Sequence, residues 1–283
     1  LLAAALFSTG GAAVKGTSFD GFSGGLAVAA MRSAVAALAL AVLVPVTRRN
    51  WSWRTLLVGM GFALTVVAFV AANKLTTSAN TIFIQSIAPL WIAIASPFVL
   101  RERVPARELA LMGLMVAALS LFFLDAPDPV RTAPQPVLGN LLALVSSIGW
   151  AATILGLRWL GKSQGGDSAA AATLAGNLIA FVACIPFATG QIGEATGNDW
   201  LLVSYLGLVQ IALAYMLLTR GVRSVAAVEV SLLLLVEPAL NPLWSWWFHG
   251  EGIGALTLAG GVVILAITTL LALRTNGYAD EHG

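Results

Sequence analysis

Two carboxylates and one guanidinium interrupt long apolar stretches of this chain. Glu229 and Glu237 lie in the stretch 225–248, and Arg32 lies in the stretch 22–46. Ionisable groups at membrane depth are costly and usually face a bundle interior or a wet cavity, so they are candidates for function. Glu237 is about twelve residues, or roughly 18 Å of helix, into its stretch. It could bind an ammonium group or carry a proton, or it could form a structural ion pair with Arg32.

Each of the other polar residues in these stretches can have a functional or a structural role. Glu229 and Asn80 lie one turn inside opposite ends of two matching stretches, which fits a pair of gates, although an acid in the first turn also complements a helix N-terminus. Arg32 could hold a carboxylate, or it could fix the packing by pairing with a glutamate or with free carbonyls.

Amide and aromatic side chains extend the set of candidates for a substrate cavity. An indole N–H at mid-depth, as in Trp150, needs a partner and could line a cavity for aromatic ligands or pack between helices. The predicted cavity residues besides Glu237 are Trp150, Gln85, Trp91, Tyr215, Asn73 and Gln210.

The sequence argues against catalysis and against metal or nucleotide cofactors. The chain has two histidines, His249 and His282, and one cysteine, Cys184. It contains neither an HExxH nor a GxSxG pattern, and it has no glycine-rich phosphate loop. We therefore expect no metal, no cofactor and no enzymatic activity, and an ATP-driven pump is disfavoured.

The composition indicates a multi-pass membrane protein with an all-α fold. Of 283 residues, 59% are hydrophobic and 10% are charged, and the mean hydropathy is +0.90. A soluble domain carries about 25% charged residues. Ten spans are predicted from the apolar runs: 1–17, 22–46, 54–73, 77–99, 106–124, 137–160, 168–189, 200–219, 225–248 and 253–273.

The two halves of the chain repeat each other. Adding 149 to positions in 51–124 gives matching residues in the second half: Trp51 and Trp200, Lys74 and Arg223, Pro89 and Pro238, Ser96 and Ser245, Glu102 and Glu251. Pro89 and Pro238 are predicted helix kinks. Since each half has an odd number of spans, the copies must be inverted, as in many secondary transporters. We predict five-helix repeats at 1–124 and 137–275, a proline-rich outer linker at 125–136 and a cytoplasmic tail at 276–283.

Loop charges predict that both termini are cytoplasmic. With that orientation the outer side holds Lys15, Lys74 and Arg131. The inner side holds eleven basic residues: Arg48, Arg49, Arg54, Arg101, Arg103, Arg107, Arg158, Lys162, Arg220, Arg223 and Arg274.

The pattern resembles the drug/metabolite transporter superfamily, specifically its EamA group. The resemblance rests on Met31-Arg32, on SIAPLWIAI at 86–94 followed by Arg101-Glu102, on LLLVEPALNPL at 233–243 and on Gly250-Glu251 before a glycine-rich last helix. Within that group the chain looks most like YddG-type exporters of aromatic and other neutral amino acids. The resemblance implies alternating access in the bacterial inner membrane.

The resulting hypothesis is a carrier for small neutral metabolites that can work as a monomer. Its expected partners are a small-molecule substrate and membrane lipid, with no nucleic acid. Export of cationic drugs or other metabolites is an alternative, and a channel-like facilitator and an intramembrane enzyme are the outside classes.

Overall fold

The protein is a bundle of helices joined by short turns. The computed structural model describes residues 2–49, 51–99, 106–124, 132–164, 167–221 and 236–282. The first half contains α1 (Leu2–Ser8), α2 (Gly10–Lys15), α3 (Gly21–Leu43), the 3₁₀ turn η1 (Pro45–Arg48), α4 (Trp53–Leu75), α5 (Ser78–Gln85), α6 (Ala88–Val99) and α7 (Ala106–Leu124). The second half contains α8 (Pro136–Gln164), α9 (Asp167–Gly193), α10 (Gly197–Tyr205), the π-helix η2 (Leu206–Leu213), α11 (Ala214–Gly221), α13 (Val236–His249) and α14 (Ala255–His282).

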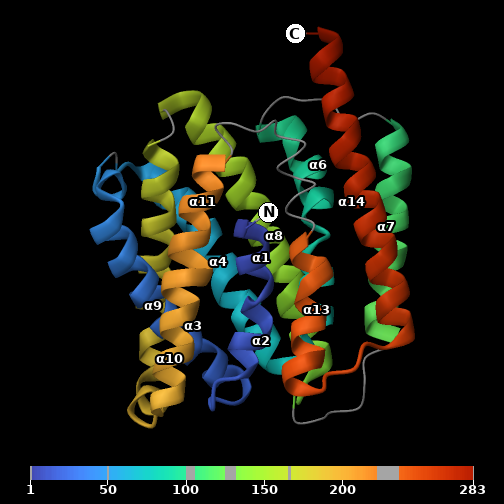
Figure 1. Cartoon of the computed structure of the whole chain (residues 1–283). Helices are drawn as coiled ribbons and strands as arrows, with labels where there is room; N and C mark the ends of the chain where they lie inside the picture. Colours follow the sequence, from blue (N-terminus) through green and yellow to red (C-terminus); the bar gives the residue numbers. More distant parts are fainter. Residues whose placement is uncertain are drawn as a thin grey trace.

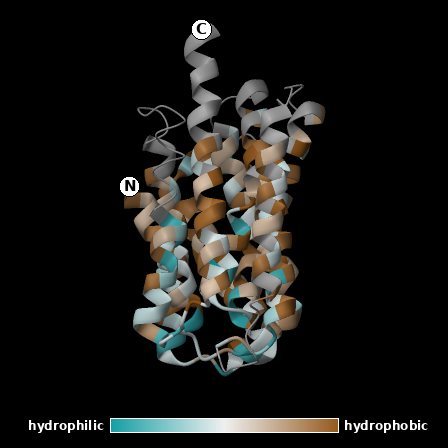
Figure 2. Ribbon diagram, turned by 90° about the vertical axis from the view of Figure 1, so that its right-hand side faces the viewer, coloured by the Kyte–Doolittle hydropathy of each residue, from teal (hydrophilic) through white to brown (hydrophobic). Residues whose placement is uncertain are grey.

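Among the residues that the structure describes, five segments are long and apolar enough to cross a membrane: Gly21–Leu43, Trp53–Leu75, Pro136–Leu157, Ser168–Gly193 and Gly197–Leu217. Two shorter apolar segments are Leu2–Lys15 and Ala255–Ile267. Figure 2 shows hydrophobic residues along the middle of the bundle and hydrophilic residues gathered toward one end. The protein is therefore a multi-pass membrane protein, and the ten spans in two inverted repeats remain a prediction.

We call the end opposite the C-terminus the distal end (Figure 1). Side-chain caps stabilise the start of two helices at this end. The Thr77 hydroxyl accepts a hydrogen bond from the backbone N–H of Asn80 in α5, and Thr196 forms a capping box with Asp199 in α10. Gly250 ends α13 with a positive φ of 65°, and its N–H donates to the carbonyl of Trp246. This turn places the next residue, Glu251, back against the bundle.

The two halves of the chain are packed into each other. α4 lies against α8 and α9, and α3 lies against α9. Small residues permit this contact, because a Cβ added to Gly149 of α8 would lie 2.8 Å from the backbone nitrogen of Thr65 in α4. One buried core joins α5, α6, α8 and α14, and another joins α2, α3, α4, α9 and α10.

Several predicted spans differ from the observed helices. The first span is interrupted at Thr9, which separates α1 from α2, and residues 206–213 wind as a π-helix inside the eighth span. The fourth span breaks into α5 and α6 after Gln85, close to the kink expected at Pro89. α14 continues to His282, so residues 276–282 of the tail predicted at 276–283 are helical. Pro238 lies in the first described turn of α13, and the preceding turn of its predicted kink falls outside the described residues.

Candidate functional site

The site is built around the break in the first helix. At the break, Ser8 donates its hydroxyl to the carbonyl of Ala5 at 2.7 Å, and Thr9 donates to the carbonyl of Leu6 at 2.8 Å. These bonds satisfy backbone oxygens that an interrupted helix leaves free, which lowers the free-energy cost of a break within a membrane span. Glycines follow directly, at positions 10 and 11.

Two other helices donate side-chain hydrogen bonds to the break. The Trp244 indole of α13 donates to Ser8 Oγ at 3.0 Å. Thr9 Oγ1 lies 2.7 Å from the Tyr205 hydroxyl of α10, and Tyr205 is the donor because Thr9 already donates to Leu6. The break therefore has a fixed geometry set by both halves of the chain.

Gln210 and Asn241 face the two glycines, and each has amide atoms with no hydrogen-bond partner among the described residues. A Cβ on Gly10 would lie 2.9 Å from Gln210 Nε2, and a Cβ on Gly11 would lie 2.6 Å from Asn241 Oδ1. Gln210 is 6% exposed with an unpaired Oε1, and Asn241 is fully buried with both amide atoms unpaired. Ser245, one turn beyond Asn241, also has an unpaired buried hydroxyl.

Such buried groups cost free energy unless something binds them, because each has lost its hydrogen bonds to water. The π-helix η2 carries Gln210, and π-helical segments occur often at functional sites. An interrupted helix beside unpaired amides is also a common design for a substrate site in transporters. The arrangement can bind a small polar ligand by hydrogen bonds and has no obvious group for covalent chemistry.

Asn73 lies beside the same glycines. Its Oδ1 would be 3.1 Å from a Cβ on Gly11, and it accepts a hydrogen bond from Ser78 Oγ at 3.0 Å. Its Nδ2 donates to the carbonyl of Phe69. The structure thus brings together two of the predicted cavity residues, Asn73 and Gln210, on either side of the break.

The predicted charged candidates lie elsewhere in the bundle. Arg32 is 3% exposed, and its Nε and Nη1 have no hydrogen-bond partner among the described residues. It interacts electrostatically with Tyr215, which in turn interacts with Glu237. The Tyr215 ring packs edge-on between Phe7 and Phe62, with centroids 5.3 and 5.5 Å away. Within the described part of the chain, no ion pair shorter than 4 Å joins Arg32 to Glu237, so the predicted structural pair is not formed here.

Other predicted residues have hydrogen-bond partners across the halves. Gln85 donates to Ser146 and the Trp91 indole donates to Ser147, both at 2.7 Å. The Asn80 amide donates to Asn140 at 3.1 Å. These contacts fix α5 and α6 against α8.

Two predicted site residues remain to be placed. Trp150 is partly buried on α8. Glu229 lies outside the described residues.

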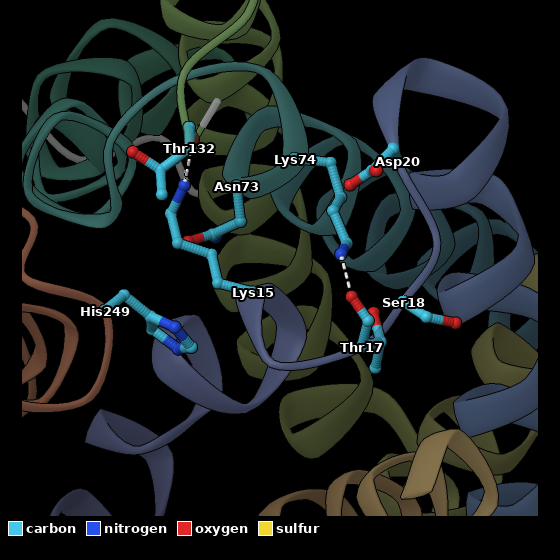
Figure 3. A pocket seen from close by; sticks show the side chains of 8 residues that line it. All are labelled: Lys15, Thr17, Ser18, Asp20, Asn73, Lys74, Thr132 and His249. Carbon is cyan, nitrogen blue, oxygen red and sulfur yellow. Dashed lines mark hydrogen bonds between the residues drawn. The ribbon is translucent and has the colours of Figure 1, made fainter. Parts of the chain in front are cut away.

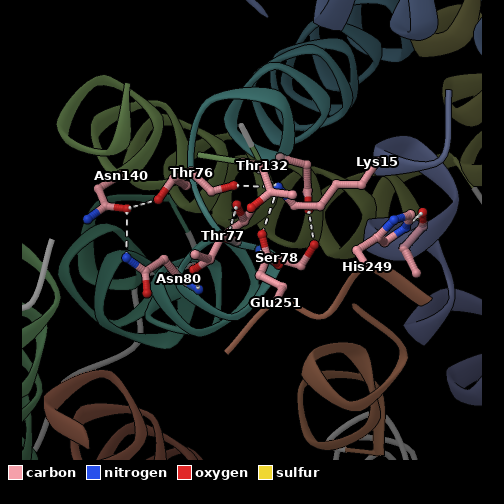
Figure 4. Close-up of polar contacts among 12 residues, drawn as sticks. Lys15, Thr76, Thr77, Ser78, Asn80, Thr132, Asn140, His249 and Glu251 are labelled. Carbon is pink, nitrogen blue, oxygen red and sulfur yellow. Dashed lines mark hydrogen bonds and ion pairs between the residues drawn. The ribbon is translucent and has the colours of Figure 1, made fainter. Parts of the chain in front are cut away.

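A buried ion pair closes the distal end (Figure 4). Lys15 Nζ lies 3.0 Å from Glu251 Oε1, and both side chains are about 5% exposed or less. The same ammonium donates to the backbone carbonyls of Thr76 and Thr132. The second Glu251 oxygen accepts the backbone N–H of Ser78 at 2.8 Å. Four separate chain segments therefore meet at one pair of charges.

A polar cavity of about 430 Å³ opens beside this ion pair (Figure 3). It is lined by Lys15, Thr17, Ser18, Asp20, Asn73, Lys74, Thr132 and His249. Asn73 forms part of its wall, so the cavity adjoins the helix break. Among the residues that the structure describes, no cluster of three or more histidine, cysteine or acidic side chains could hold a metal ion.

Sequence reasoning missed Asn241, Lys15 and Glu251 as site residues. Asn241 follows Glu237 by one helical turn, a spacing visible in the sequence. The sequence identified Lys15 as a loop charge and Glu251 as a repeat match, and their pairing joins opposite ends of the chain.

Comparison with known proteins places this geometry in a family. The model of the EamA-like transporter family matches residues 1–124 and 137–273. An uncharacterised transporter of Archaeoglobus fulgidus is 25% identical over 205 residues, covering 72% of this chain and 70% of the relative. A pseudopaline exporter of Pseudomonas aeruginosa is 26% identical over 220 residues, covering 77% and 74%.

One further relative agrees with that match, and one solved structure has a similar fold. The uncharacterised transporter YetK of Bacillus subtilis is 26% identical over 223 residues, covering 73% of this chain and 65% of the relative. A solved crystal structure described only as a protein aligns over 97% of this chain and 96% of its own, with a TM-score of 0.56 and 23% identity. That likeness supports the fold alone.

Proposed function

Because this chain belongs to the EamA-like transporter family, we propose that it is a secondary transporter that exports small zwitterionic metabolites, in particular aromatic and other neutral amino acids. The observation that carries the proposal is the pair of unpaired buried amides, Gln210 and Asn241, at the break of the first helix. Amides can donate to a carboxylate and accept from an ammonium group. They suit a substrate whose charges cancel.

Aromatic side chains support the choice of substrate. Tyr205 and Trp244 each donate a hydrogen bond to the break, at Thr9 and Ser8, the two residues before the glycines that the amides face. Aromatic surface with a few placed polar groups is typical of small-molecule sites. One relative is named as an exporter of pseudopaline, which supports export as the direction.

The proposal includes an orientation and a mechanism. We place both termini in the cytoplasm and the distal end outside, because eleven basic residues gather at the other side of the predicted topology. The repeats 1–124 and 137–275 would rock about the break to expose it alternately to each side. A monomer would contain both repeats and therefore a whole substrate path.

Counterflow in proteoliposomes tests the function. Vesicles are loaded with unlabelled phenylalanine, tracer is added outside, and no pH or voltage gradient is applied. We expect saturable accumulation of tracer phenylalanine and threonine, and none of glutamate. Accumulation of the cation methyl viologen alone would reject amino acids as the cargo, and an absence of counterflow for every compound would reject a carrier of these substrates.

Replacing Glu237 with glutamine tests proton coupling. Glu237 lies in a predicted membrane span, and no ion pair joins it to Arg32 within the described part of the chain. If its carboxyl carries the coupled proton, Glu237→Gln should make phenylalanine uptake independent of pH between pH 5.5 and 8.5, a range chosen to span about three decades of proton concentration. An unchanged pH profile in this variant, with uptake retained, would assign Glu237 a structural role.

A further inference from the structure

The two lysines of the distal cavity are used differently. A lysine ammonium has three N–H donors. Lys15 has three acceptors: the Glu251 carboxylate and the carbonyls of Thr76 and Thr132. Lys74 is 7% exposed, and the acceptor found for it in the described residues is the carbonyl of Thr17 at 2.9 Å. Lys74 therefore keeps hydrogen-bonding capacity that the protein does not use.

The acids near Lys74 do not neutralise it by direct contact. Asp20 and Asp199 interact with it electrostatically, and Lys15 opposes them. No ion pair shorter than 4 Å joins Lys74 to either acid in the described part of the chain. The wall of the cavity thus carries a buried cation with unused donors.

Asp199 is not available to a ligand. Its carboxylate accepts the backbone N–H and hydroxyl of Ser18, at 2.7 and 2.6 Å, and those of Thr196, at 2.8 and 2.6 Å. Asp20, by contrast, is an exposed acid on the cavity wall. Figure 3 shows Lys74 and Asp20 side by side on this wall. One cation and one anion are therefore open to the cavity together.

We propose that the distal cavity is a second substrate station, in which Lys74 binds the carboxylate and Asp20 the ammonium group of a zwitterionic substrate. The volume of about 430 Å³ is within the range of small-molecule sites. Asn73 lines the cavity and lies against Gly11, so this station adjoins the amides of the break. The identity of the cargo rests on the proposed function, and the binding of a zwitterion at Lys74 is the new claim.

Ligand protection of a cysteine in the cavity wall tests the station directly. Thr132 lines the cavity and binds Lys15 through its backbone carbonyl, so its side chain can be replaced. The full chain carries Thr132→Cys in a Cys184→Ala background, which removes the native thiol. Purified protein in detergent reacts with a maleimide in the presence of L-phenylalanine, phenethylamine or N-acetyl-L-phenylalanine. Detergent exposes both faces, so membrane orientation does not affect the result.

We expect L-phenylalanine to slow the labelling, and phenethylamine and N-acetyl-L-phenylalanine to slow it far less. Lys74→Gln should raise the L-phenylalanine concentration for half-protection about tenfold or more, as expected for a lost charge-assisted hydrogen bond. Lys74→Arg keeps the charge and should retain protection, which separates binding from misfolding.

Three outcomes would overturn the proposal. The first is the same L-phenylalanine concentration for half-protection in Lys74→Gln and its parent. The second is labelling that L-phenylalanine does not slow, and the third is a new cysteine that does not react with the maleimide even without ligand. Counterflow without protection would reject the station alone. Protection without counterflow would reject the transport of phenylalanine and leave the station in place.

Discussion

Replacing Glu251 with glutamine should destabilise the folded protein by about 3–5 kcal/mol, the usual cost of removing one partner of a buried ion pair. Glutamine keeps the size of the side chain and can still accept the N–H of Ser78. It removes the charge that Lys15 faces at 3.0 Å, and it leaves that ammonium buried with two carbonyl acceptors. The measurement is the midpoint and free energy of unfolding in detergent.

A double-mutant cycle separates the pair from its surroundings. Lys15→Met alone should also destabilise the protein, because it leaves the Glu251 carboxylate buried without its cation. The double variant should cost clearly less than the sum of the single variants, since neither charge remains. Additive losses would show that the two charges do not stabilise each other. Glu194→Gln is the matched control: this acid is exposed near the distal end and should change stability by less than about 0.5 kcal/mol.

The ion pair also bears on the proposed mechanism. Lys15 lies in the first half of the chain and Glu251 in the second, and both Thr76 and Thr132 contribute carbonyls to the same ammonium. Opening of the distal end would have to separate these segments. A weakened pair should therefore increase the maleimide reactivity of a cysteine at position 132.

Long apolar runs made much of the fold predictable. The stretch 54–73 appears as Trp53–Leu75, and 168–189 appears within Asp167–Gly193, because a hydrophobic run bounded by polar residues must bury its backbone bonds in a helix. Such a run does not reveal an interruption that tertiary contacts stabilise. The break at Thr9 depends on Tyr205 and Trp244, which lie far away in sequence.

The candidate site was also predictable in part, because polar residues stand out in apolar runs. Gln210 and Asn73 could be selected as lone amides in apolar spans, and the structure places both beside the break. Lys15 could not be selected, because a charge near a span end normally contacts water or headgroups. The turn at Gly250 directs Glu251 toward Lys15, and the carbonyls of Thr76 and Thr132 supply the other acceptors of the buried ammonium.

Gly11→Ala should reduce transport at least tenfold while leaving the protein folded. The new Cβ would lie 2.6 Å from Asn241 Oδ1, 3.0 Å from Ser78 Oγ and 3.1 Å from Asn73 Oδ1. All three contacts are side-chain ends, so the site can relax by moving them, at a cost of about 1–3 kcal/mol of overpacking. The amide of Asn241 would leave its place beside the break, and loss of one substrate hydrogen bond is worth about tenfold in rate.

Gly16→Ala provides the control for this change. Gly16 follows α2 directly, and its added Cβ would meet a flexible methyl group of Leu202 at 3.2 Å. We expect this variant to retain counterflow and stability. Equal activity of Gly11→Ala and Gly16→Ala would place substrate binding away from the helix break. A loss of counterflow confined to Gly11→Ala, in a protein that stays folded and loses no more than about 3 kcal/mol of stability, would link the unpaired amide of Asn241 to transport.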